Sequence, residues 1–298
     1  MKYASIDIGT NSCRLMIAEI ENGGFKVLYR DMKTTRIGAG LSSSGQISPE
    51  AAERTLQCLG RFQDAISRKG VADYLIVATS AVREAANRAW FEELCRLRLH
   101  KEVKVISGEE EAHLTYKGVQ KSLLLDRPLL VADLGGGSTE LIYSQEDLYV
   151  RSLPLGAVKG AEIQITERQI MDILEEIKEV KVRFSDAALV FCGGTATSAV
   201  AMKYGMIDYD SSLVHGQRLK KEEVQQCYDS LLNMPLEKRK NIRGLQTERA
   251  DIIVYGLMIM LNLMRVLEKD WAVVSESDLL EGLIWEMDEL KSPKSASS

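Results

Sequence analysis

The sequence predicts an α/β protein built from two similarly patterned halves. Two observations carry this prediction: strand-like and helix-like segments alternate along the chain, and one short pattern occurs twice. The copies are residues 6–15 and 132–141. Each reads as a strand, an aspartate (Asp7 or Asp133), a glycine-containing turn, a serine and a second strand. We therefore expect each copy to open one domain.

The elements of the first half follow from local patterns. Ser48 and Pro49 predict a helix start, with Ser48 as N-cap. The apolar run Tyr74–Thr79 has the length of a buried strand, and Ser107 is expected to cap a helix. The remaining predictions are a strand near 24–31, a polar loop at 38–48, a helix through Trp90 and Leu94, and a strand at 103–106.

The second half opens with a predicted strand at 129–133. A helix is expected over 167–184, and strands at 188–192 and 271–275. The apolar stretch Ile252–Met264 is shorter than the roughly 20 residues that a membrane-spanning helix needs, so we predict a buried core helix. The tail from Lys291 is rich in Ser, Lys and Pro and is expected to fray.

Composition narrows the class of protein. The chain has 298 residues, 45% of them hydrophobic and 27% charged, as in ordinary globular proteins. Its net charge of -5 does not suggest a nucleic-acid-binding protein. Five cysteines without a C-x-x-C pattern argue against a disulfide framework or a zinc site. No signal peptide is recognisable, and we expect a cytoplasmic protein without membrane or nucleic-acid partners.

The two glycine-containing turns are candidate phosphate sites. Backbone N–H groups and hydroxyls at one point can cradle phosphate oxygens, and the neighbouring Asp7 or Asp133 could hold Mg²⁺ or its waters. Neither turn has the P-loop or G-x-G-x-x-G pattern. The alternative is a pair of tight hairpins with glycine for geometry alone. The candidate residues are Gly9, Thr10, Asn11 and Ser12 in the first Gly turn, and Gly135, Gly136, Gly137, Ser138 and Thr139 in the second Gly turn.

A carboxylate-rich segment follows Ser107. Ser107 and Glu110 fit a capping box, which together with the helix dipole explains Glu109 and Glu110. Glu111 lies one residue beyond the box. It could act as general base on a water that attacks phosphorus.

Further candidates are a third turn and three arginines. Gly193, Gly194 and Thr195 lead from a strand into a helix, which suits either an anion site or close helix–strand packing. The arginines are candidates to hold phosphate, although a single arginine is more often a solvated surface group. They are Arg14, Arg83 and Arg249.

These residues together resemble the exopolyphosphatase and guanosine pentaphosphate phosphohydrolase (Ppx/GppA) family. The resemblance rests on residues 6–12, 106–112 and 133–140, with weaker marks at 214–216, 249–251 and 280–283. It implies two actin-like (RNase H-like) domains with an active-site cleft between them. The domains would cover 1–125 and 126–283, with a helix at about 284–298 returning to the first.

The resemblance also implies roles for single residues. Glu111 matches the family's base, and Asp133 and Glu140 match carboxylates associated with the metal and the attacking water, with Asp7 across the cleft. Arg14 and Arg249 match residues that hold the phosphate chain. The expected activity is release of terminal orthophosphate from inorganic polyphosphate or guanosine pentaphosphate (pppGpp), with Mg²⁺ or another divalent cation.

The sequence also departs from the family. His113 stands where members often carry Arg, which leaves chain-length preference open. The chain resembles the short, two-domain members that lack a C-terminal helical region, so short polyphosphate or pppGpp is as good a candidate as long polymer. Guanosine tetraphosphate is a further candidate ligand, and the family suggests a homodimer. The alternatives are an actin-like kinase or ATPase, a non-catalytic alarmone sensor and, more remotely, a filament protein.

Overall fold

A computed structural model of the chain describes residues 1–291 except 22, 72, 124 and 146. The chain divides into two compact units, one formed by Met1–Gly118 with the chain from Leu279, the other by Val119–Asp278. The first boundary between the units follows Gly118, seven residues before the domain boundary predicted at residue 125. It lies inside the uninterrupted helix α5 (Gly108–Ser122). The predicted frayed tail and the end of the predicted helix at 284–298 lie outside the described residues.

The first unit contains a five-stranded mixed sheet in the order β3-β2-β1-β4-β5. The first three strands are antiparallel neighbours, and β4 and β5 run parallel to β1. The strands are β1 (Lys2–Ile8), β2 (Ser12–Glu21), β3 (Gly24–Thr34), β4 (Asp73–Ala78) and β5 (Lys104–Val105).

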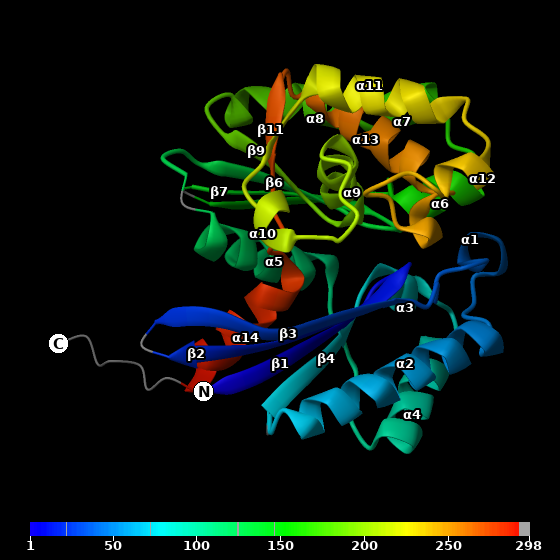
Figure 1. Cartoon of the computed structure of the whole chain (residues 1–298), viewed down its shortest axis with the longest axis vertical. Helices are drawn as coiled ribbons and strands as arrows, with labels where there is room; N and C mark the ends of the chain where they lie inside the picture. The colour runs from blue at the N-terminus through cyan, green and yellow to red at the C-terminus, as the bar shows by residue number, and fades with distance from the viewer. Residues whose placement is uncertain (22, 72, 124, 146, 292–298) are drawn as a thin grey trace. The chain divides into compact units, whose positions relative to one another are not determined.

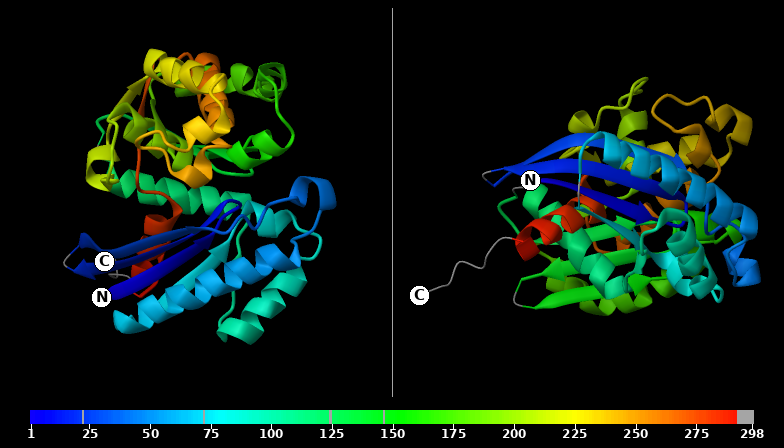
Figure 2. Two further views of the ribbon diagram at one scale, coloured as in Figure 1. Left: turned by 45° about the vertical axis from the view of Figure 1, so that its right-hand side comes forward. Right: turned by 90° about the horizontal axis from the view of Figure 1, so that it is seen from below.

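Helices cover both faces of this sheet (Figures 1 and 2). Because side chains alternate along a strand, Ala4, Ile6 and Ile8 of β1 join the core beneath α2 and α4. Tyr3 points to the opposite face and packs with α14. The helices of this unit are α1 (Leu41–Ser44), α2 (Pro49–Arg68), α3 (Ser80–Glu84), α4 (Arg88–Leu99), the first part of α5, and α14 (Leu279–Lys291).

The second unit repeats the arrangement. Its sheet has the order β10-β11-β9-β6-β7-β8, in which β6, β7 and β8 are antiparallel and β9 and β11 run parallel to β6. This is the order of the first sheet with one added antiparallel strand. Two such sheets define the actin-like fold, and the predicted fold class is confirmed. The strands are β6 (Leu129–Leu134), β7 (Thr139–Ser144), β8 (Leu148–Leu153), β9 (Ala188–Cys192), β10 (Arg218–Lys220) and β11 (Trp271–Val274).

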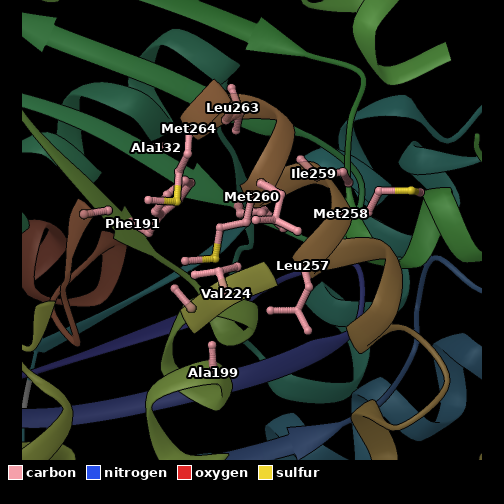
Figure 3. Packing of buried hydrophobic residues seen from close by; sticks show 14 of the residues in the cluster. Ala132, Phe191, Ala199, Val224, Leu257, Met258, Ile259, Met260, Leu263 and Met264 are labelled. Carbon is pink, nitrogen blue, oxygen red and sulfur yellow. The ribbon is translucent and has the colours of Figure 1, made fainter. Parts of the chain in front are cut away.

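The core of the second unit is centred on α13 (Ile253–Val266). In Figure 3 its residues Leu257–Met264 lie among Ala132 of β6, Phe191 of β9 and Val224 of α11. This confirms the buried core helix expected from the apolar stretch. Among the described residues, no helix combines the length and apolar character that a membrane crossing requires. The other helices are α6 (Ala157–Glu162), α7 (Glu167–Ile173), α8 (Glu175–Val180), η1 (Lys181–Phe184), α9 (Gly194–Lys203), α10 (Ser211–Val214), α11 (Lys221–Leu232), α12 (Leu236–Arg239) and η2 (Thr247–Arg249).

Three local predictions need correction. The single helix expected over 167–184 is three shorter pieces, α7, α8 and η1. Its buried residues Ile170, Leu174, Ile177 and Phe184 all belong to the core of the second unit. The predicted loop at 38–48 contains the short helix α1, and strand β8 was not predicted.

Candidate active site

The predicted site residues gather at one edge of each sheet. Parallel strands end at the same edge, which is where ligands bind in open α/β sheets. In the first unit the chain leaves β1 into the first Gly turn, β4 into α3 with Arg83, and β5 into α5 with Glu111. In the second unit it leaves β6 into the second Gly turn and β9 into the third turn.

The first Gly turn is a tight hairpin whose carbonyls face the chain that follows β3. The N–H of Gly9 donates to Ser12 O at 3.0 Å, and the N–H of Gly38 donates to Thr10 O at 3.1 Å. Thr35 and Arg36 both donate their N–H groups to Asn11 O. Among the described residues, no acceptor takes the N–H of Thr10 or Asn11, so both donors remain for a ligand.

Asp7 and Arg14 face each other across this hairpin. They are register partners on β1 and β2. Arg14 donates from Nη2 to Asp7 Oδ2 at 2.7 Å and from Nε to the same oxygen at 2.9 Å. The Asp7 side chain is 5% exposed. A buried carboxylate needs a partner that offsets its lost hydration. The main role of Arg14 is therefore to pair with Asp7.

Glu111 is buried in the first turn of α5 and is held by Arg83. Arg83 Nη1 donates to Glu111 Oε2 at 2.9 Å and to Ile106 O at 3.1 Å. The guanidinium therefore fixes the orientation of this carboxylate. The predicted capping box is confirmed: Glu110 N donates to Ser107 Oγ, and Ser107 N donates to Glu110 Oε2, each at 3.0 Å.

The second Gly turn repeats the first. The N–H of Gly135 donates to Ser138 O at 3.0 Å. The turn's carbonyls accept from the start of α6: Gly135 O from Ala157, and Gly136 O from Val158 and Lys159. No described residue accepts the N–H of Gly136 or Gly137. The buried hydroxyl of Thr139 donates to Leu155 O. This side chain therefore joins the end of the turn to the segment that follows β8.

Asp133 and Glu140 occupy the positions that Asp7 and Arg14 occupy in the first unit. They are opposed on β6 and β7. Glu140 is 2% exposed and accepts a hydrogen bond from Ser152 Oγ at 2.8 Å. Two carboxylates directly opposite each other repel, and a cation between them would remove that repulsion. The pair therefore fits a divalent metal better than Asp7, which has Arg14 opposite.

The third turn is packed closely on both sides. Gly193 has φ 93°, and a Cβ there would lie 2.5 Å from Leu134 O and 3.4 Å from Asp133 Oδ1. Arg249 Nη1 donates to Gly194 O at 2.7 Å and to Ser198 Oγ at 3.1 Å. The Thr195 side chain packs against Gly256 of α13. Gly193 thus serves packing, and it places Asp133 beside the start of α9.

Sequence reasoning missed two glycines that support the Gly turns. A Cβ on Gly38 would lie 2.4 Å from Thr10 Cγ2, and one on Gly156 would lie 2.3 Å from Gly136 O. Both glycines follow the third strand of their unit. The duplicated pattern therefore extends beyond the repeated segments 6–15 and 132–141. A glycine shortly after the third strand of each half, four residues on in the first and three in the second, was the available signal. The hydrogen bond between Arg83 and Glu111 was not predicted from the sequence either.

No group of three or more metal-ligating side chains occurs within the described part of the chain. A cation at Asp133 and Glu140 would need further oxygen ligands from water and substrate. Mg²⁺ at phosphate sites is commonly bound in this way, by one or two carboxylates.

Two actin-like sheets, each with a Gly turn after its central strand, place the chain in the actin-like fold class. The sequence model of the Ppx/GppA phosphatase family matches residues 16–291. The chain belongs to this family, as the resemblance predicted.

Relatives with assigned activities match 95% or more of the chain. A bifunctional 3-dehydroquinate synthase/phosphatase of Fusobacterium nucleatum is 32% identical, over 95% of this chain and 46% of that protein. A guanosine-5'-triphosphate,3'-diphosphate pyrophosphatase of Vibrio parahaemolyticus is 30% identical, over 97% of this chain and 60% of that protein. Exopolyphosphatase 2 of Mycobacterium tuberculosis is 28% identical, over 95% of this chain and 97% of that protein. The chain thus spans about half the length of the first two.

Solved structures agree with the fold. The crystal structure of the Aquifex aeolicus Ppx/GppA family member has a TM-score of 0.82 and 30% identity, and the match covers 98% of this chain and 99% of that one. An exopolyphosphatase from Cytophaga hutchinsonii has a TM-score of 0.89 at 22% identity, over 97% of this chain and 98% of that one. The second likeness concerns the fold alone.

Proposed function

We propose that this protein hydrolyses terminal phosphoanhydride bonds and releases orthophosphate from inorganic polyphosphate or pppGpp. The observation that carries the proposal is the buried Glu111–Arg83 pair at the strand edge that also bears the first Gly turn. A buried carboxylate held by an arginine, beside the proposed phosphate-binding donors, suits activation of an attacking water. The names of the Vibrio and Mycobacterium relatives support both substrates.

Glu111 is the proposed general base. Arg83 fixes one carboxylate oxygen of Glu111 and so orients the side chain. The carboxylate then accepts a proton from the attacking water as the new oxygen–phosphorus bond forms and the bridging bond to the leaving phosphate breaks. General-base catalysis of this kind contributes about 10² to 10⁴ in rate.

The Gly turns are the proposed phosphate contacts. Thr10 and Asn11 in one unit, and Gly136 and Gly137 in the other, would donate N–H groups to phosphate oxygens. The hydroxyls of Ser12 and Ser138 could add to them. Because Arg14, Arg83 and Arg249 already hydrogen-bond Asp7, Glu111 and Gly194, a guanidinium would bind phosphate only through N–H groups not used in these bonds.

A divalent cation, Mg²⁺ in this proposal, would be held by Asp133 and Glu140. It would neutralise charge that develops on the phosphate oxygens. Asp7 remains a weaker candidate ligand, because its Oδ2 atom accepts both hydrogen bonds from Arg14.

The test is phosphate release with Mg²⁺ from short polyphosphate, long polyphosphate, pppGpp and ATP. Glu111→Gln should keep substrate affinity and lose at least 100-fold in kcat. Glu109→Gln, an exposed neighbour in the same helical turn, is the matched control and should keep wild-type turnover.

Three results would replace the proposal. Near-normal turnover in Glu111→Gln would remove Glu111 from the base role. Tight pppGpp binding without phosphate release would favour an alarmone sensor. Formation of ADP together with a phosphorylated acceptor would favour a kinase.

A further inference from the structure

His215 contacts both segments through which the chain passes between the two units. The chain leaves the first unit within α5, between Gly118 and Val119, and returns to it between Asp278 and Leu279. His215 Nε2 lies 3.4 Å from the carbonyl oxygen of Ser122, the last residue of α5. His215 Nδ1 lies 3.2 Å from the backbone nitrogen of Glu276, two residues before the return. All three residues belong to the second unit.

The two contacts determine the state of the imidazole. A backbone N–H can only donate, so Nδ1 must accept from Glu276. A carbonyl oxygen can only accept, so Nε2 must carry the hydrogen that points to Ser122. Both bonds form together only in the neutral Nε2–H tautomer. In that state the ring is a two-ended connector between the segments.

The connector is itself anchored. Val214 is fully buried, and Gly216 N donates to Val274 O at 2.8 Å. Val274 N in turn donates to Gln217 O at 2.8 Å. These bonds fix His215 to the end of β11, and so its ring has little freedom to follow movement of either segment.

The return segment is held from several directions. Ser275 N donates to Phe191 O at 2.8 Å, and Ser277 N donates to Ser275 Oγ at 3.1 Å. The Glu276 carboxylate accepts from the hydroxyl of Tyr209. His215 adds the end of α5 to this fixed segment.

We propose that His215 is a positioning residue, which joins the last residue of α5 to the segment that leads into α14. The proposal rests on the proposed function, because its effect on turnover acts through Glu111 at the other end of α5. Eleven residues separate Glu111 from Ser122, or about 16 Å of helix. A change of about 4° in the tilt of α5 would displace one end of the helix by about 1 Å relative to the other, and a misplacement of about 1 Å can cost about 100-fold in rate.

Two amide variants each keep one of the two hydrogen bonds of His215 and remove the other, and so distinguish their contributions. In His215→Asn the amide oxygen can replace Nδ1 and keep the bond from Glu276. In His215→Gln the amide N–H₂ can replace Nε2 and keep the bond to Ser122. His215→Ala removes both bonds. His100→Gln is the control, because His100 is an exposed histidine of the first unit and should leave exchange and kcat unchanged.

Hydrogen exchange gives the readout that does not depend on activity. Exchange at the Glu276 amide should rise at least tenfold in His215→Gln and His215→Ala, and stay near wild type in His215→Asn. Exchange at the last turn of α5 should rise in His215→Asn and His215→Ala. The midpoint of thermal unfolding should change little in the two amide variants, since the rest of the unit's packing is untouched.

Kinetics supplies the second readout. We expect kcat to fall at least tenfold in His215→Ala with KM nearly unchanged, and to recover partly in the two amide variants. Wild-type exchange and wild-type kcat in His215→Ala would overturn the proposal, as would a general loss of protection throughout the second unit. If Glu111→Gln kept its turnover, the proposed function would fail, while the exchange pattern would still decide whether His215 joins the two segments.

Discussion

Gly156 lies against the second Gly turn, and its replacement by alanine should damage that turn specifically. The added Cβ would lie 2.3 Å from Gly136 O and 2.4 Å from the carbonyl carbons of Gly136 and Gly137. Ordinary contact begins at 3.4 Å, so the turn must move by about 1 Å. A shift of about 1 Å in groups that position a substrate costs about 100-fold in kcat/KM. Overpacking of this kind also costs about 1–3 kcal/mol of stability.

The assay is phosphate release under kcat/KM conditions, paired with thermal unfolding of the same preparation. Gly60→Ala is the control, because the structure places no described atom within 4 Å of the added Cβ in the helix α2. That variant should keep full activity and gain about 0.5–1 kcal/mol from the better helix propensity of alanine. Activity within threefold of wild type in Gly156→Ala, with an unchanged unfolding midpoint, would refute the argument that this close approach shapes the turn.

Two further predictions concern stability. In Gly282→Ala the Cβ would lie 1.9 Å from Leu114 O, so α14 must separate from α5. We expect a loss of about 3 kcal/mol and a fall of about 6–10 °C in the thermal midpoint, and a fall under 2 °C would contradict the close packing. Ser107→Ala removes the cap of α5 and should lower the urea-derived free energy of unfolding by about 1 kcal/mol. The backbone N–H of Ser107, followed by Lys104, lowers the pKa of Glu110. The contribution of Glu110 is therefore present above its unfolded pKa and lost as pH falls through the lowered one. Glu110→Gln should be less stable than wild type at neutral pH and equal to it in acid, and a pH-independent difference would argue against this ionic contribution.

The sequence by itself determined the features that depend on local chemistry. Helix α2 begins after Ser48, and α5 begins with the capping box of Ser107 and Glu110, because these caps are satisfied within one turn of helix. The two hairpins and their turns could be predicted because their glycines and flanking apolar residues are neighbours in the chain. Their recurrence also predicted two similarly built halves.

The tertiary structure decided what depends on contacts between distant segments. The interval 167–184 contains no Gly or Pro and has a helical apolar period, so no local signal predicted its division into three pieces. Arg83 meets Glu111 because α3 and α5 follow adjacent parallel strands. Gly156 must be glycine because a turn 20 residues earlier folds back onto it. Such contacts join positions that share no local pattern, because burial and close packing, rather than the neighbouring residues, select the side chains there.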